Sequence, residues 1–176
     1  MMYLACALLL LAIIFFFQKN SASGAIYSRF GVRESSHRLI STDLGKSEGR
    51  LKLARFGING IPDAVFEAVS GKEILVGEFK SRKYRNQVRL VELYQVQLYL
   101  GHIQAMYPRH KVVGCLAYAD GRVLVNFDPA VYEALLGLRD EYWITVRYKR
   151  VADSRPLHKR MNVASQNRSL RLSASL

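Results

Sequence analysis

Cysteine is scarce in this chain of 176 residues, which holds only Cys6 and Cys115. Two cysteines are too few for a disulfide framework or for a metal site built on several thiolates. Cys6 lies in an apolar leader and Cys115 in a predicted strand. Both are interpreted as apolar packing residues.

Several catalytic signatures are also absent. The chain has no Gly-x-x-x-x-Gly-Lys loop for nucleotide phosphates and no Gly-x-Ser-x-Gly turn for a nucleophilic serine. Its histidines do not show the spacing of zinc ligands; they are His37, His102, His110 and His158. These absences exclude the P-loop, the serine-hydrolase elbow and the usual zinc motifs.

Acidic residues are few relative to basic ones, 14 against 26, which gives a formal net charge of +12 and a pI near 10.0. Such a balance favours a polyanionic partner, either nucleic acid or an anionic membrane surface. Simple solubility is the alternative interpretation. Half of the residues are hydrophobic, so the chain can bury a core and global disorder is not expected.

The first 17 residues, Met1–Phe17, carry no charged side chain. As a helix they would extend about 25 Å, which is at the short end for crossing a bilayer. Basic residues follow, starting with Lys19 and Arg29, and the positive-inside rule places the rest of the chain in the cytoplasm. Small residues at 21–25 also fit a signal-peptide cleavage site, so a secreted protein is the alternative.

We therefore expect a transmembrane signal anchor over 1–18, a juxtamembrane connector over 19–32, one domain over 33–146 and a basic flexible tail over 147–176. The tail is serine-rich and has little core-forming pattern. Simple solvation of this tail and contact with nucleic acid or lipid both remain open.

β-branched and aromatic residues between turn signals predict strands in four places. A fifth strand is expected over 50–58, which alternates basic and apolar residues. The others form two hairpins, one turning at Ser70–Gly71 and one at Asp120–Gly121. The predicted strands are Asp63–Val69, Glu73–Lys80, Lys111–Tyr118 and Arg122–Phe127.

Helical periodicity runs from Asn86, the expected N-cap, to Met106. A short helix is expected near 34–40, and a last helix from Asp128 or Pro129 to Trp143. The fold class is therefore α/β: a mixed central β-sheet flanked by helices, with an N-terminal transmembrane helix.

Charged residues interrupt the first hairpin. Glu78 and Lys80 point to one face of their strand because side chains alternate, and an antiparallel neighbour would bring Asp63 beside them. Two carboxylates suit Mg²⁺, and a nearby ammonium can stabilise charge on a phosphoryl oxygen. The alternative is an exposed ion pair of small energetic value. The apolar stretch 74–76 before Glu78 argues against a fully solvated strand face.

Three segments together resemble a known family: GIPD (60–63), GEFKS (77–81) and YQVQLY (94–99). In order and spacing they are similar to the PD-(D/E)XK nuclease superfamily, in its RecB-like branch, which has a restriction-endonuclease-like core. The downstream hairpin looks like that of CRISPR-adaptation exonucleases. The resemblance covers about residues 31–143.

The resemblance implies roles for particular residues. Asp63 and Glu78 would hold Mg²⁺ or Mn²⁺, together with the backbone carbonyl of Phe79, and Lys80 would be the catalytic lysine. Gln95 and Tyr99, one helical turn apart, would stabilise the site or contact the DNA backbone.

The family also places a histidine or an acid upstream as a further metal ligand. His37 is the first candidate for that position and Glu34 is the second. The CRISPR-associated relatives hold an iron–sulfur cluster on four cysteines, which this chain lacks, so no iron–sulfur cluster is expected.

The sequence therefore predicts a membrane-anchored, Mg²⁺- or Mn²⁺-dependent deoxyribonuclease that hydrolyses phosphodiester bonds. Its expected location is the bacterial inner membrane, single-pass, with the domain in the cytoplasm. The expected partners are DNA, the membrane and a DNA-transfer or defence machinery. Alternatives are a catalytically inactive module that tethers DNA or an assembly partner to the membrane, and a secreted nuclease if the leader is cleaved.

Overall fold

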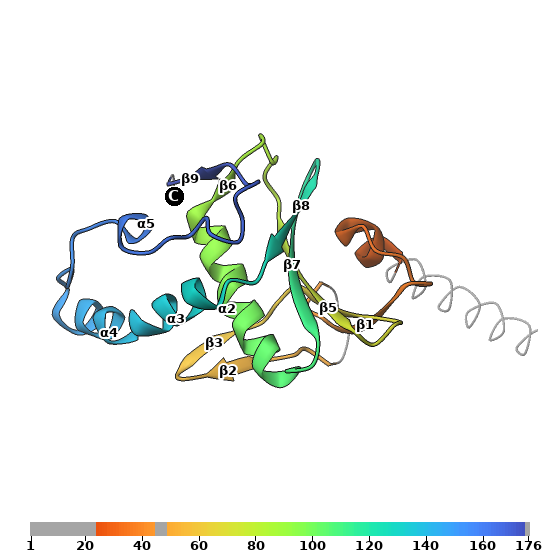
Figure 1. Cartoon of the computed structure of the whole chain (residues 1–176), viewed down its shortest axis with the longest axis horizontal. Helices are drawn as coiled ribbons and strands as arrows, with labels where there is room; N and C mark the ends of the chain where they lie inside the picture. Colours follow the sequence, from red (N-terminus) through yellow and green to blue (C-terminus); the bar gives the residue numbers. More distant parts are fainter. Residues whose placement is uncertain (1–23, 45–48, 175–176) are drawn as a thin grey trace, which may run out of the picture.

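The computed structural model describes residues 24–44 and 49–174. Their central element is one five-stranded sheet (Figure 1). The strand order is β1-β4-β5-β7-β8. Only β5 and β7 run parallel; the other neighbours pair antiparallel. The sheet is therefore mixed, as predicted. Its strands are β1 (His37–Thr42), β4 (Ala64–Ala68), β5 (Glu73–Lys80), β7 (Lys111–Tyr118) and β8 (Arg122–Asn126).

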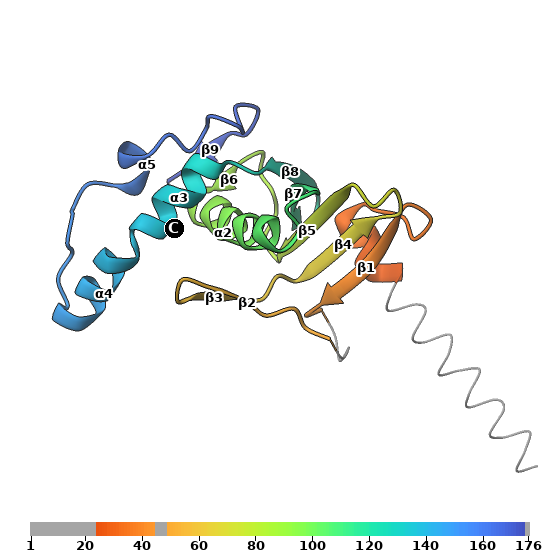
Figure 2. The same ribbon diagram turned by 60° about the horizontal axis from the view of Figure 1, so that its bottom comes forward.

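Helix α2 (Leu90–Met106) connects the two parallel strands and packs on one face of the sheet (Figure 2). Alternation in β5 turns Ile74 and Val76 toward this helix, where they join a buried cluster with Val96 and Leu100. Glu78 and Lys80 continue the same face, so the fold directs both charged side chains toward α2.

The helical segment 24–30 covers the opposite face of the sheet. Phe30 lies against Gly77, where an added Cβ would come within 2.5 Å of the Phe30 ring. Cys115 is buried in the same cluster, and burial raises the pKa of its thiol to about 11. Its predicted role as apolar packing agrees with this environment.

The two predicted hairpins are confirmed. β5 and β7 have the predicted bounds, and β4 and β8 lie within the predicted segments. β4 and β5 pair antiparallel with Ala64 opposite Gly77. Short runs of β-branched and other apolar residues between turn signals made these strands predictable from the sequence.

Two predictions near the start of the domain are wrong. Residues 37–42 form strand β1 rather than part of a helix, because backbone pairing with β4 outweighs a weak local helical pattern. The predicted strand 50–58 is a small hairpin instead, formed by β2 (Leu53–Arg55) and β3 (Ile58–Gly60). Its turn lies at Phe56 and Gly57, both with positive φ, as a tight two-residue hairpin turn requires.

The start of α2 also differs from the prediction. Asn86 has a left-handed backbone, and the N-cap is Arg89. Residues Val88–Arg89 form strand β6, which pairs in parallel with β9 (Leu172–Ser173). The backbone nitrogen of Arg89 donates to Glu92 Oε2 at 3.1 Å, so the helix begins only at Leu90.

The last predicted helix is divided into α3 (Pro129–Gly137) and α4 (Arg139–Tyr148), which extends beyond Trp143. The division follows Gly137, a residue that disfavours helix. Asp128 caps α3 by accepting from the backbone nitrogens of Ala130 and Val131.

Part of the expected tail contacts the domain. Residues Leu157–Arg160 form the short helix α5. Val163 and Asn167 are buried, and the amide of Asn167 exchanges hydrogen bonds with the backbone of Asn126 at 2.8 and 3.1 Å. The sequence pattern contained no signal for these contacts, since they depend on isolated residues rather than on periodicity.

The predicted transmembrane helix, and the inner-membrane localisation derived from it, require correction. Within residues 24–44 and 49–174, no helix combines the length and the apolar character needed to span a bilayer. The longest described helix, α2, has 17 residues and includes Glu92 and His102. The segment 1–18, on which the prediction rested, and residues 19–23 of the connector lie outside the described residues.

Candidate active site

Asp63 lies directly before β4, beside the carboxyl-terminal half of β5. Because Ala64 pairs with Gly77, Asp63 lies opposite Glu78. Its Oδ2 accepts a hydrogen bond of 2.6 Å from the backbone nitrogen of Phe79. The antiparallel hairpin thus brings the first predicted carboxylate to the second.

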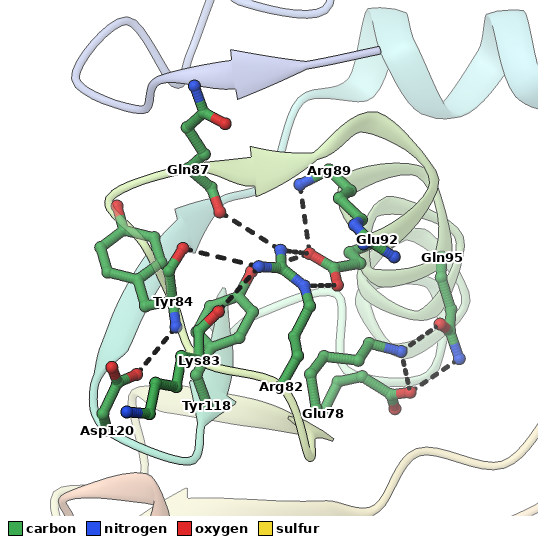
Figure 3. A network of polar contacts seen from close by, with 11 residues as sticks. Glu78, Arg82, Lys83, Tyr84, Gln87, Arg89, Glu92, Gln95, Tyr118 and Asp120 are labelled. Carbon is green, nitrogen blue, oxygen red and sulfur yellow. Dashed lines mark hydrogen bonds and ion pairs between the residues drawn. The ribbon is translucent and has the colours of Figure 1, made fainter. Parts of the chain in front are cut away.

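Glu78, Lys80 and Gln95 form a closed set of hydrogen bonds between β5 and α2 (Figure 3). Lys80 Nζ donates to Glu78 Oε1 at 2.9 Å and to Gln95 Oε1 at 2.8 Å. Gln95 Nε2 donates to the same Glu78 oxygen at 2.8 Å. The amide therefore holds the carboxylate and the ammonium in fixed relative positions.

Tyr99 extends this set by one helical turn, since Gln95 Nε2 also lies 2.9 Å from the Tyr99 hydroxyl. The Tyr99 ring packs against Gly60 in β3, where an added Cβ would lie 2.4 Å from Tyr99 Cε1. Gly60 is therefore required for close approach of the hairpin to the ring. All five residues predicted to be catalytic therefore lie in one neighbourhood: Asp63, Glu78, Lys80, Gln95 and Tyr99.

Burial sets the electrostatics of the two carboxyl groups. Glu78 is 6% exposed, and its Oε2 is buried without a hydrogen-bond donor among the described residues. Burial raises the pKa of Glu78 above its ordinary value, although Lys80 opposes the shift. Burial likewise raises the pKa of Asp63, against the hydrogen bond from Phe79. Lys80 and the Phe79 N–H offset only part of the cost of ionising both carboxyl groups, and a bound cation would offset more of it.

Neither candidate for the upstream metal ligand, His37 or Glu34, lies beside Asp63 and Glu78. His37 pairs with Ala68, at the end of the β1–β4 pair away from Asp63, and its Nδ1 lies 2.9 Å from Ser36 Oγ. Glu34 is exposed in the turn before β1. The structure does not bring either residue to the carboxylates.

Asp43 takes the place beside Asp63 instead. Its backbone nitrogen donates to the carbonyl of Asp63 at 3.0 Å, and its negative charge contributes to the raised pKa of Asp63. Asp43 also pairs with Arg50 at 2.6 Å. The sequence analysis missed this residue because it assigned 34–40 to a helix. A strand there, antiparallel to β4, would have indicated Asp43.

Described residues contain no group of three or more His, Cys, Asp or Glu side chains arranged to hold a metal ion. Asp63 and Glu78 nevertheless fit a divalent cation that needs few protein ligands, because Glu78 Oε2 is buried and available. Mg²⁺ and Mn²⁺ are of this kind, accept carboxylate oxygen and retain several waters. The donor set does not suit zinc, which prefers nitrogen and sulfur.

A second network supports the start of α2 from the loop after β5 (Figure 3). The Arg82 guanidinium donates to both oxygens of Glu92, at 2.8 and 2.6 Å, and the Tyr118 hydroxyl donates to Glu92 at 2.9 Å. Arg82 also donates to the carbonyls of Lys83 and Gln87 at 2.9 and 3.2 Å. The sequence analysis missed this network, because an arginine and a glutamate ten positions apart form no recognisable motif.

This network also determines the charge of Glu92. Burial alone would raise the pKa of Glu92, but the hydrogen bonds from Arg82 and Tyr118 outweigh burial and hold that pKa below its ordinary value. The loop and helix therefore meet at a fixed ion pair. Gln95 lies one turn further along the same helix.

Arg29 provides a cationic group on the Phe79 side of the sheet. Its Cζ lies 4.2 Å from the centre of the Phe79 ring, and its charge lowers the pKa of Asp63 against the effect of burial. A pocket of about 620 Å³ opens there, and its lining includes Arg29, Phe79 and Arg122. Two arginines thus line a cavity at Phe79, whose side chain lies on the opposite face of β5 from Glu78 and Lys80.

Comparison with known proteins gives a distant likeness in structure alone. No family model matches the chain, and no curated protein matches it. Among solved structures, a complex of EndoMS with double-stranded DNA aligns at a TM-score of 0.34 and 20% identity, over 56% of this chain and 36% of that chain. The crystal structure of SSO0001 aligns at a TM-score of 0.40 and 14% identity, over 88% of this chain and 68% of that chain. The chain thus spans about a third of the length of the EndoMS chain.

Proposed function

We propose that this protein is a Mg²⁺- or Mn²⁺-dependent deoxyribonuclease that hydrolyses phosphodiester bonds. One observation carries the proposal: the hydrogen-bonded arrangement of Glu78, Lys80 and Gln95 beside Asp63. A surface ion pair does not need a half-buried glutamine to hold both of its partners. Such positioning is characteristic of groups that must meet a substrate in a defined geometry.

Asp63 and Glu78 would hold the divalent ion, with the carbonyl of Phe79 as a further oxygen. When bound, the ion would activate water and neutralise charge on the phosphate. Its positive charge would also lower the pKa of both carboxyl groups, against the effect of burial, which raises it.

Lys80 would stabilise the negative charge that develops on a phosphoryl oxygen, and Glu78 and Gln95 keep its ammonium in place. Gln95 would orient both groups without exchanging a proton. Tyr99 would hold the amide of Gln95 in the orientation that allows this.

A DNA substrate fits the charge of the protein. The net charge of +12 would attract a polyphosphate chain, and Arg29 and Arg122 line a cavity at Phe79, the residue that follows Glu78. Arginine binds phosphate oxygens in a bidentate manner.

The proposal is tested with the full chain and labelled DNA, single-stranded and duplex, in EDTA, Mg²⁺ or Mn²⁺. We expect cleavage only with a divalent ion. Asp63→Asn and Lys80→Ala should each lower the cleavage rate by at least about a hundredfold, while DNA affinity, measured by fluorescence anisotropy, changes little. Lys72→Ala, an exposed lysine in the turn at the other end of the hairpin, is the matched control and should cleave normally.

Two outcomes would reject the enzyme. Cleavage that persists in EDTA, or in both variants, would mean that other groups perform the reaction. DNA binding by the parent protein without cleavage in either metal would favour the non-catalytic DNA-binding module.

A further inference from the structure

The exposed aromatic residues of the described chain lie in two elements, the β2–β3 turn and α4. They are Phe56 (51% exposed), Tyr142 (60%), Trp143 (53%) and Tyr148 (58%). Phe56 lies in the β2–β3 turn and the other three lie on α4, a helix with no buried residue. A helix that is stabilised by its own packing would bury an apolar stripe, and α4 buries none.

The turn and the helix lie side by side, as both ribbon views indicate (Figures 1 and 2). They line a pocket of about 350 Å³, to which Gly57, Tyr142 and Trp143 contribute. An added Cβ on Gly57 would lie 3.7 Å from Arg139 Nε. The Tyr142 and Trp143 rings meet edge to face, with centroids 5.2 Å apart. We call Phe56, Tyr142, Trp143 and Tyr148 the aromatic platform.

Positive charge is interleaved with these rings. Arg55 lies over the Phe56 ring at 4.5 Å, and Arg150 lies 5.8 Å from the Tyr148 ring. Of the acids on α4, Glu141 is paired with Arg160 at 2.9 Å, and Asp140 is exposed. The exposed basic residues of the β2–β3 turn and the α4 region are Arg55, Arg139, Arg147, Lys149 and Arg150.

The platform is continuous with the candidate active site through β3. Ile58 and Asn59 line the pocket at the platform and also a second, mostly apolar pocket of about 290 Å³. Gln95 and Tyr99 line that second pocket. An extended polymer bound to the platform could therefore reach the predicted catalytic residues by crossing the β2–β3 hairpin.

We infer that the aromatic platform binds single-stranded nucleic acid by stacking on its unpaired bases. This inference rests on the proposed function and adds a strand preference to it. Rings placed among arginines match a polymer that offers a π-face and a phosphate at each unit. A duplex keeps its base faces stacked inside, so only an unpaired strand can use the rings.

Trp143 makes the inference directly measurable, because it is the only tryptophan in the chain. The full chain is titrated with oligothymidylate in EDTA, and tryptophan emission and oligonucleotide anisotropy are recorded. We expect quenching of Trp143 as the strand binds. Trp143→Leu should weaken binding of the strand by about tenfold, whereas Trp143→Phe should keep affinity within about threefold of the parent. For a duplex of the same length, the loss of affinity in Trp143→Leu should be smaller than this tenfold loss, and Trp143→Phe should bind like the parent.

The control for loss of exposed apolar area is Leu124→Ala, which removes a 62% exposed side chain from β8. Its affinity should equal that of the parent. Unchanged emission at saturating strand, or equal affinity of Trp143→Leu and the parent, would overturn the inference. A second copy of the chain is the competing occupant: if Trp143→Leu abolishes self-association in sedimentation and leaves strand affinity unchanged, the platform is a protein interface.

The outcomes separate this inference from the proposed function. Quenching by single strands without any cleavage would keep the platform and reject the nuclease. Metal-dependent cleavage with no role for Trp143 in strand affinity would keep the nuclease and reject the platform.

Discussion

Asp63 and Glu78 hold negative charge where burial disfavours it, and this conflict can be measured at single residues. Because burial raises the pKa of Asp63 above 3.8, the folded state binds that proton more tightly than the unfolded state does. The free energy of unfolding therefore decreases as pH rises through the raised pKa. At neutral pH the metal-free protein bears the full cost.

Asp63→Asn should for this reason stabilise the metal-free protein. The side-chain oxygen of the introduced amide can still accept from the backbone nitrogen of Phe79, while the disfavoured charge is gone. We expect a gain of at most about 1 kcal/mol at pH 7 in urea unfolding, which disappears as pH falls toward 3.8. Asp140→Asn, at an exposed acid, should produce no gain. A variant less stable than the parent at pH 7 would contradict this account of the site.

Gly60 controls the position of Tyr99. An alanine there would place its Cβ 2.4 Å from Tyr99 Cε1, so the ring must move and its hydrogen bond with Gln95 must lengthen. We expect Gly60→Ala to lower the metal-dependent cleavage rate by about tenfold, with an unchanged circular dichroism spectrum. Gly137→Ala is the control, because no atom lies within 4 Å of its added Cβ. Equal cleavage by the two variants would mean that Tyr99 has no positioning role.

At the scale of elements, the Arg82–Glu92 pair joins the loop after β5 to the first turn of α2. Glu92 is almost fully buried and Arg82 is partly exposed. A lysine at position 82 keeps the charge but cannot contact both carboxylate oxygens and the loop carbonyls together. The pair therefore depends on the shape of the guanidinium as much as on its charge.

Arg82→Lys should destabilise the fold by about 2 kcal/mol in chemical denaturation at pH 7. Since the pKa of Glu92 is held below 4.5, the contribution of the pair is fully present above that pH and is lost as pH falls through the lowered pKa. The parent and the variant should converge in stability under acid. Arg85→Lys, an exposed arginine in the same loop, serves as control. A loss that persists unchanged at low pH would point to packing rather than to the ion pair.

The elements also show what the sequence can predict. Strands β5 and β7 follow from short apolar runs between turn signals. Glu78, Lys80, Gln95 and Tyr99 follow from fixed spacing within one strand or one helix. Asp43 could not be found in this way, because it reaches Asp63 only through the pairing of β1 with β4. The same holds for Arg82 and Glu92, and for Asn167, whose partners lie far away in the sequence. Local patterns specify elements, whereas pairing between distant segments specifies the rest of the site.

At the scale of the whole molecule, the charge of +12 would govern how strongly the proposed DNA substrate binds. Neutralising phosphates releases their counterions, so affinity should fall steeply with salt. We expect the affinity for an oligonucleotide in EDTA to drop on the order of a hundredfold or more between about 50 and about 200 mM salt. Anisotropy titrations at several salt concentrations measure this slope. A flat dependence would mean that the basic residues do not contact the phosphate chain.

The parallel pairing of β6 with β9 places residues 172–173 against the strand that leads into α2. During synthesis, Gln95 and Tyr99 leave the ribosome long before their helix can acquire that neighbour. In a nascent chain, β6 would lack its partner strand β9 until residue 173 has emerged. For the proposed nuclease, such a delay would keep the candidate site incomplete until translation has passed that point.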